Sequence, residues 1–322
     1  MTPKELAAGV ERGERRSLAK SITLLESKAP NDRILGEELL SYLSNTKTSS
    51  IRIGITGVPG AGKSTFIETF GLYVISKGFK VAVLAVDPTS PITGGSILGD
   101  KTRMPNLATH PSAFIRPSPS GGNLGGVTLK TRESIQILES AGYDVILIET
   151  VGVGQSEISV SEMTDFFLLI LIAGAGDELQ GIKKGIMEMA DLILINKADN
   201  NNVVAAELAR NEYKTAIHFL KSRRDYWISD VLTVSALHNK NIDKVWDTIE
   251  TFRVQTAEHI QDNRTIQRRK WLLDSTESSF REEIERITSS NPEILLIQEK
   301  VAMGEISIRE ATRTILDTFK KS

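Results

Sequence analysis

The sequence contains no cysteine, which excludes disulfide bonds, cysteine nucleophiles and metal sites built on thiolates. Histidine is also scarce: its 4 copies stand singly, and no two of them have the spacing of paired metal ligands. We therefore interpret each histidine as an ordinary surface or core residue. Because a chain without cysteine suits a reducing compartment, we expect a cytoplasmic protein.

Long apolar runs are missing as well. The longest, Phe166 to Ala173, is too short to cross a bilayer and instead predicts a central buried strand. The first residues, Met1 to Leu6, show neither the apolar stretch nor the cleavage pattern of a secretory signal. The net charge is −2, so there is no basic excess, and we expect neither a membrane nor a nucleic acid as partner.

The chain is long enough, at 322 residues with 40% hydrophobic residues, to form one large α/β domain with helical additions. From residue 51 to about 256, apolar runs alternate with helical segments, which predicts a mostly parallel sheet with helices on both faces. Strands are expected near 51–56, 80–86, 113–116, 144–149, 166–172, 191–196 and 231–234. Helices are expected between them, near 63–77, 128–141, 157–162, 203–222 and 239–256.

The two ends of the chain lack the strand pattern and are expected to be helical. We divide the chain into an N-terminal helical extension (1–48), the α/β domain (49–256) and a C-terminal helical region (257–322). Behind a capping-box spacing near the C-terminus lies an apolar stripe formed by Ile308, Ala311, Ile315 and Phe319. The stripe either packs on its own domain or forms a subunit interface, and the sequence leaves both open.

The most specific motif follows the first expected strand and fits G-x-x-x-x-G-K-[ST]. It consists of Gly57, Val58, Pro59, Gly60, Ala61, Gly62, Lys63 and Ser64, with Thr65 next in the expected helix. Strand, glycine-rich loop and helix in this order form a phosphate-binding loop, whose backbone N–H groups surround the phosphates. Lys63 is expected to reach the β- and γ-phosphates, and the Ser64 hydroxyl to bind Mg²⁺.

A second motif, N-K-x-D, follows the expected strand near 191–196 and is typical of guanine recognition. The carboxylate of Asp199 can accept from guanine N1–H and its exocyclic amine, whereas adenine leaves such an acceptor unpaired. Lys197 is expected to lie along the base, and Asn196 to join this loop to the phosphate loop. Backbone N–H groups further along the chain are candidates to meet guanine O6, in the run Ser235, Ala236 and Leu237. Together the motifs favour GTP over ATP.

Two acidic residues end strands beside the phosphate loop. Asp87 ends the strand near 80–86 and is well placed to hold a Mg²⁺-bound water. Glu149 ends the strand near 144–149, where small GTPases have an aspartate instead. Gly152 follows three residues later, and in small GTPases the N–H of a glycine at this spacing meets the γ-phosphate. After this glycine the chain has Val153, where many small GTPases have a water-orienting glutamine. We therefore expect slow intrinsic hydrolysis that a partner or a conformational change accelerates.

These residues carry a specific family resemblance. The chain is similar to the methylmalonyl-CoA mutase-associated GTPases of the ArgK/MeaB type, P-loop GTPases of the SIMIBI class, in the segments GVPGAGKST, VLAVDPTS, GGSILGDKTRM, RPSPSGGNLGG, YDVILIETVGVGQSE and INKAD. The resemblance implies a homodimeric GTPase that binds GTP or GDP with Mg²⁺. It also implies a chaperone of an adenosylcobalamin-dependent acyl-CoA mutase, which controls the loading of intact cofactor and the release of damaged cofactor.

The resemblance also implies roles for individual residues. It adds Asp100 to Asp87 and Glu149 in the environment of Mg²⁺ and the switches. It further implies that residues 174–183, here called the third-switch loop, respond to the mutase, with Asp177, Gln180 and Lys183 as the matching polar side chains. A lysine brought to the γ-phosphate can stabilise charge in the transition state.

Two other functions remain open at this point. The first is a metallochaperone GTPase for nickel enzymes, although the sequence lacks the clustered cysteine and histidine ligands that such proteins usually carry. The second is a protein kinase of an amino-acid transport system, because a phosphate loop alone is compatible with transfer to a protein. The guanine motif and the lack of a motif for a substrate-hydroxyl base disfavour this second function.

Overall fold

A computed structural model of the chain describes eight segments, namely residues 1–27, 29–43, 49–87, 103–119, 124–150, 156–174, 184–220 and 223–319. Inside these segments the side chains of 86–87, 118–119, 124–128, 156 and 184 are not described. Clustering of contacts divides the chain into two compact units, Met1–Arg268 and Arg269–Ser322.

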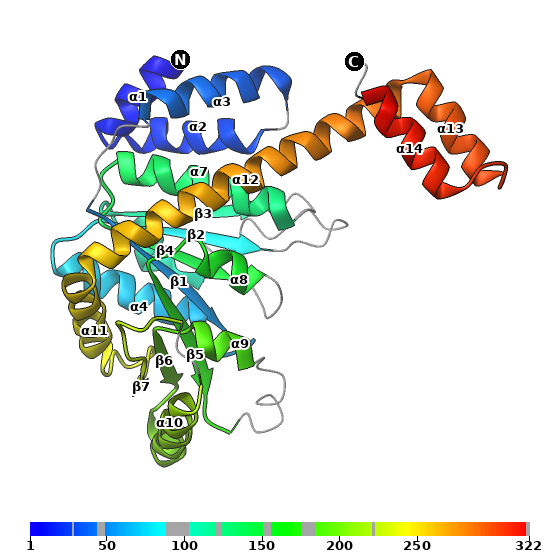
Figure 1. Cartoon of the computed structure of the whole chain (residues 1–322). Helices are drawn as coiled ribbons and strands as arrows, with labels where there is room; N and C mark the ends of the chain where they lie inside the picture. The colour runs from blue at the N-terminus through cyan, green and yellow to red at the C-terminus, as the bar shows by residue number, and fades with distance from the viewer. Residues whose placement is uncertain are drawn as a thin grey trace. The chain divides into compact units, whose positions relative to one another are not determined.

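The first unit is built around a parallel sheet of 7 strands in the order β3-β2-β4-β1-β5-β6-β7 (Figure 1). The strands are β1 (Ile51–Gly57), β2 (Val81–Asp87), β3 (Ala113–Pro119), β4 (Val145–Thr150), β5 (Phe166–Ile172), β6 (Leu192–Asn196) and β7 (Asp230–Thr233). The central strands are almost continuously apolar and buried, because helices cover both faces of a parallel sheet.

The helices pack in two groups on this sheet. One group consists of α4 (Lys63–Ser76), α6 (Pro105–Thr109) and α11 (Ile242–Gln255); the other consists of α7 (Leu124–Ser140), α8 (Ser156–Ser161) and α9 (Lys184–Met189). The last crossover helix, α10 (Val203–His218), packs on β6 and β7. The expected α/β fold with a mostly parallel sheet is therefore confirmed. Every expected strand is present within one residue of its predicted bounds except β3, which ends three residues later than predicted.

The short helices α6 and α9 were not expected, and the predicted helix near 203–222 ends earlier, at His218. Helices of five or six residues make less than two turns, so no apolar stripe repeats along them.

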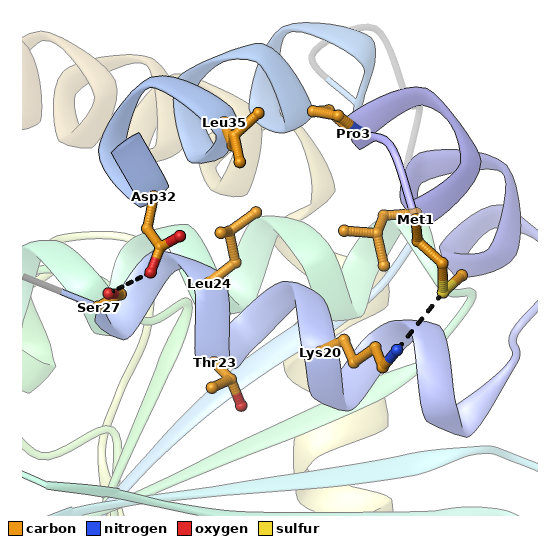
Figure 2. A pocket seen from close by; sticks show the side chains of 9 residues that line it. Met1, Pro3, Lys20, Thr23, Leu24, Ser27, Asp32 and Leu35 are labelled. Atoms are coloured by element: carbon orange, nitrogen blue, oxygen red, sulfur yellow. Dashed lines mark hydrogen bonds between the residues drawn. The ribbon is translucent and has the colours of Figure 1, made fainter. Parts of the chain in front are cut away.

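Three helices precede the sheet, namely α1 (Pro3–Glu11), α2 (Arg15–Glu26) and α3 (Pro30–Leu43). They pack on one another and on α7, and an ion pair between Arg116 and Glu26 joins them to β3. A cavity of about 310 Å³ lies among the three helices (Figure 2) and is mainly apolar, with a hydrogen bond of 2.6 Å between Ser27 and Asp32 in its wall. None of the predicted nucleotide-binding residues lines it.

A buried ionic cluster holds the beginning of α12 (Ala257–Ser290) against the edge of the sheet where the strands start. Arg264 donates to Asp165 at 2.8 Å and to the Ser50 carbonyl at 2.7 Å. Glu139 accepts two hydrogen bonds of 2.8 Å from Arg52. The charge and hydrogen bonds of Arg264 lower the pKa of Asp165, although burial opposes this.

The second unit contains the rest of α12 and the helices α13 (Pro292–Ala302) and α14 (Ile308–Phe319). The last two helices pack on each other, and each buries one side chain, Ile294 in α13 and Ala311 in α14. The predicted cap of α14 is present, because Ser307 accepts from the Glu310 N–H at 3.2 Å. Of the predicted stripe only Ala311 is buried, whereas Ile308 is 75% exposed. Among the described residues, no helix combines the length and the apolar character that a membrane span requires.

Candidate nucleotide-binding site

The predicted site residues gather at one edge of the sheet, where the parallel strands end. From β1 and β4, which are neighbours, the chain continues in opposite directions: β1 leads through α4 to β2, and β4 leads through α8 to β5. Such a reversal of strand order leaves a crevice beyond the strand ends, in which α/β proteins bind ligands. The phosphate loop (residues 57–64) follows β1, Glu149 lies in β4, and the base loop (residues 196–199) begins at the end of β6.

The backbone of the phosphate loop requires glycine at two points. Gly57 has φ of +155°, and a Cβ there would lie 2.1 Å from the carbonyl oxygen of Ile170. Gly62 has φ of +86°, and a Cβ there would lie 2.8 Å from the Asn196 amide nitrogen. Because α4 begins at Lys63 and the preceding glycine has no side chain to cap it, no side chain caps the first N–H groups of α4, an arrangement that suits the binding of an anion.

Lys63 and Ser64 lie at the start of α4, beside Glu149. The ammonium of Lys63 donates to the Gly57 carbonyl at 2.8 Å. Burial lowers the pKa of Lys63, and the carboxylates of Glu149 and Glu157 act in the opposite direction. Ser64 Oγ donates to Glu149 Oε1 at 3.3 Å, and Glu149 is only 3% exposed. A hydroxyl and a carboxylate oxygen at this separation are the hard oxygen donors that Mg²⁺ prefers, so these residues fit the cation.

Asn196 joins the two halves of the site. Its amide nitrogen donates to the Ala61 carbonyl in the phosphate loop at 2.8 Å, and its oxygen accepts from the Ala236 N–H at 3.1 Å. The side chain is 2% exposed, so both bonds are shielded from water. Asn196 thus makes the connection between the loops that the sequence predicts.

Asp199 is held by the loop that follows β7. Ser235 donates its hydroxyl to Asp199 Oδ2 and accepts from the His238 N–H at 3.2 Å. Lys197, before it in the base loop, has φ of +59°, and its carbonyl accepts from the Asn202 amide at 2.8 Å. These contacts hold the Asp199 carboxylate in place beside the loop that follows β7.

The three predicted donors to guanine O6 differ in their hydrogen-bond partners. The Ser235 N–H donates to the Lys240 carbonyl at 3.2 Å, and the Ala236 N–H donates to Asn196. Leu237, which is 73% exposed, is thus the member of this run whose N–H has no acceptor within the described residues. The Ala236 carbonyl accepts from Thr69 Oγ1 at 2.8 Å, which ties this loop to α4.

Several predicted residues lie outside the described part of the chain. These are Asp100, Gly152, Asp177, Gln180 and Lys183, and the side chain of Asp87. Conversely, sequence reasoning missed two residues. Thr69 donates to the Ala236 carbonyl in the loop after β7, and Glu157, which is fully buried, acts to raise the pKa of Lys63. Neither residue belongs to a motif with a fixed spacing, so no sequence signal identified them.

Comparisons with known proteins show which family the chain belongs to. A family model described as methylmalonyl Co-A mutase-associated GTPase MeaB matches residues 18–289. GTPase ArgK of Escherichia coli is 50% identical over 83% of this chain and 82% of its own length. The mouse protein called methylmalonic aciduria type A homolog, mitochondrial, is 42% identical over 98% of this chain and 79% of its own length.

A solved structure shows the same fold. It is described as a LAO/AO transport system kinase, is 37% identical, and superposes with a TM-score of 0.76 over 99% of this chain and 97% of its own. With a phosphate loop, a guanine-type base loop and these similarities along nearly its whole length, the chain belongs to the MeaB family of P-loop GTPases.

Proposed function

We propose that this protein hydrolyses GTP to GDP and phosphate with Mg²⁺, as an accessory protein of an adenosylcobalamin-dependent acyl-CoA mutase. The observation that carries the proposal is the joined site: Asn196 connects the phosphate loop to the loop after β7, and Ser235 of that loop donates to the Asp199 carboxylate. The mutase as partner is supported by the description of the matching family and by the name of the mouse relative.

In the proposed reaction the protein contributes mainly position and charge. Lys63 and the N–H groups of the phosphate loop hold the phosphates, and Asp199 with its Ser235 partner selects the base. Bound Mg²⁺ would neutralise charge on the phosphates, and Ser64 and Glu149 are the described residues that would hold it, with Asp87 and Asp100 as further candidates from the sequence. No glutamine follows Gly152 directly, so we propose that the third-switch loop supplies the missing stabilisation when the mutase binds.

The cellular role that we propose is control of cofactor traffic. The protein would let the mutase take up intact adenosylcobalamin and release damaged cofactor, and would couple each event to GTP binding or hydrolysis. The client is one of the acyl-CoA mutases that act on methylmalonyl-CoA, isobutyryl-CoA, ethylmalonyl-CoA or 2-hydroxyisobutyryl-CoA.

We also propose that the protein acts as a homodimer. The second unit exposes large apolar side chains along its helices, which need a cover. They include Leu272 (68% exposed), Leu273 (70%), Phe280 (66%), Met303 (73%) and Ile308 (75%). A double variant, Leu273→Glu with Phe280→Glu, should shift the protein from dimer to monomer in analytical ultracentrifugation. A monomeric wild-type protein at tens of micromolar would refute this part of the proposal.

The test of the function is GTP turnover with and without purified mutase. Slow turnover alone and at least tenfold faster turnover with one of the four mutases would support it, and Lys63→Ala should abolish both rates. If none of the mutases binds the GDP form or the GTP-analogue form, the chaperone role is wrong.

A protein kinase is the second candidate, because the solved structure that this chain resembles is described as a transport system kinase. The same turnover assay distinguishes the two functions when it uses GTP labelled at the γ-phosphate. Label released as free phosphate supports the GTPase, whereas label retained on a protein acceptor supports the kinase.

A further inference from the structure

Two helices lead away from the switch segments and end close together. The first, α8, follows Glu149 and its switch segment and ends at Ser161; the second, α9, follows the third-switch loop and ends at Met189. Each lies in a connection that leads from the end of one parallel strand, at the nucleotide edge of the sheet, back to the start of the next strand at the opposite edge. At that opposite edge Ser161 Oγ lies 3.5 Å from Met189 Sδ.

One residue contacts the final turns of both helices. The backbone N–H of Arg223 donates to the Glu188 carbonyl of α9 at 3.2 Å. Its guanidinium donates through Nη2 to the Ser161 carbonyl of α8 at 3.0 Å. The last carbonyls of a helix have no partner within the helix, and a cationic donor is favourable there. Arg223 therefore connects α9, through its backbone, to α8, through its side chain.

The position of Arg223 is fixed by the residues that follow it. Arg224, which is 6% exposed, pairs with Asp191 at 2.8 Å and donates to the Asp165 carbonyl at 2.6 Å. Trp227 donates from Nε1 to the Asp191 carbonyl at 2.9 Å. These contacts attach the segment 223–229 to the starts of β5 and β6, so Arg223 has a rigid base from which to hold both helices.

We propose that Arg223 is a positioning residue that makes the two switch helices move together. A displacement of the third-switch loop would move α9, and the link through Arg223 would transmit it to α8 and the switch segment after Glu149. This inference rests on the proposed function for its biological meaning, since the mutase is the partner expected to act on the third-switch loop. Arg223 lies about 40 positions beyond that loop in the chain, and at the edge of the sheet opposite the expected nucleotide site.

The variant Arg223→Gln breaks only one side of this link, because the backbone bond to Glu188 remains in every variant except proline. Arg223→Lys keeps a cationic donor and should partly restore the contact with the Ser161 carbonyl. Arg210→Gln is the matched control, since Arg210 is another surface arginine and pairs with Glu207 within α10.

Hydrogen exchange of the free protein tests the link without the mutase. In the wild type, replacing GDP by a non-hydrolysable GTP analogue should change amide protection in both α8 (156–161) and α9 (184–189). In Arg223→Gln we expect the change in one helix to fall at least fivefold while the other responds as before, with Arg223→Lys between the two and Arg210→Gln like the wild type. Coupled changes in both helices of a folded Arg223→Gln protein would overturn the proposal. If that variant does not fold, the comparison between Arg223→Lys and the wild type decides in the same way.

Turnover gives the second readout. Mutase stimulation of GTP hydrolysis should fall at least fivefold in Arg223→Gln, whereas KM for GTP and the unstimulated kcat stay within twofold of the wild type. An unchanged stimulation factor would also overturn the proposal. If the wild type is not stimulated by any mutase, the proposed function fails, but the exchange experiment still tests Arg223.

Discussion

Asn196 is the side chain through which the phosphate loop and the base side of the pocket meet, and replacing it with alanine should weaken guanine-nucleotide binding strongly. The substitution removes the donor to the Ala61 carbonyl at 2.8 Å and the acceptor of the Ala236 N–H at 3.1 Å. Because the side chain is 2% exposed, water does not readily replace either bond.

The size of the effect follows from these two bonds. Each buried polar group that loses its partner costs about 1–3 kcal/mol, and here two groups do so, the Ala61 carbonyl and the Ala236 N–H. Because the loops relax in part, the joined arrangement should be destabilised by about 2–4 kcal/mol. If the nucleotide binds only the joined arrangement, binding must restore it, and affinity falls by about 30-fold to 1,000-fold. Asn196→Asp keeps the acceptor but puts a buried anionic oxygen against the Ala61 carbonyl oxygen, so we expect a loss of affinity at least as large as that of Asn196→Ala.

Isothermal titration calorimetry with GDP and Mg²⁺ measures these affinities directly. Asn202→Ala is the matched control, because Asn202 donates to the neighbouring Lys197 carbonyl at 2.8 Å in a bond that is exposed to solvent. It should change affinity by less than about fivefold. An Asn196→Ala protein that is folded and binds GDP within threefold of the wild type would refute the reasoning.

Three further predictions concern charge. Lys63→Ala should lower GTP turnover by at least about 100-fold in a phosphate-release assay, because it removes the ammonium beside the phosphate loop; turnover within tenfold of the wild type would contradict this. Burial raises the pKa of Glu133 to about 7, so the folded state holds its proton more tightly than the unfolded state. The unfolding free energy, measured by urea titration, should therefore fall by about 2–3 kcal/mol between pH 4.5 and pH 7 because of Glu133. Glu133→Gln should remove this contribution to the pH dependence, whereas Glu37→Gln should largely keep it. Arg264→Met leaves Asp165 buried without its main partner and should lower the unfolding free energy by about 3–5 kcal/mol; a loss below about 1 kcal/mol would show that the ionic cluster is not needed.

The sequence predicted the sheet well because its strands are simple signals. In a parallel sheet covered on both faces, each strand is a short apolar run, and β5 and β6 have no polar residue before their ends. The same logic located the site, since Asn196 and Glu149 each lie in the last two residues of such a run. Among the helices of one to two turns, α8 was expected near its observed bounds, whereas α6 and α9 gave no comparable signal.

The contacts that hold the site together were less accessible to sequence reasoning. Asn196 meets a carbonyl 135 residues away, and Ser64 meets a carboxylate 85 residues away. Motif spacing specified the first of these pairs because both residues belong to known loops. It did not specify the Ser235 hydroxyl as the partner of Asp199, or Arg223 as a link between two helices, because these contacts depend on how the loops fold onto the sheet.

The central claim is that a carboxylate at Asp199 selects guanine, and exchanging its chemistry tests the claim most directly. Titration calorimetry should compare GTP, ATP and xanthosine triphosphate, in non-hydrolysable form, on the wild type and on Asp199→Asn. We expect the wild type to prefer the guanine nucleotide over the other two by at least about 100-fold, and the variant to prefer the xanthine nucleotide, whose C2 carbonyl accepts where guanine donates. Equal binding of adenine and guanine nucleotides by the wild type, or an unchanged order of preference in the variant, would contradict the account.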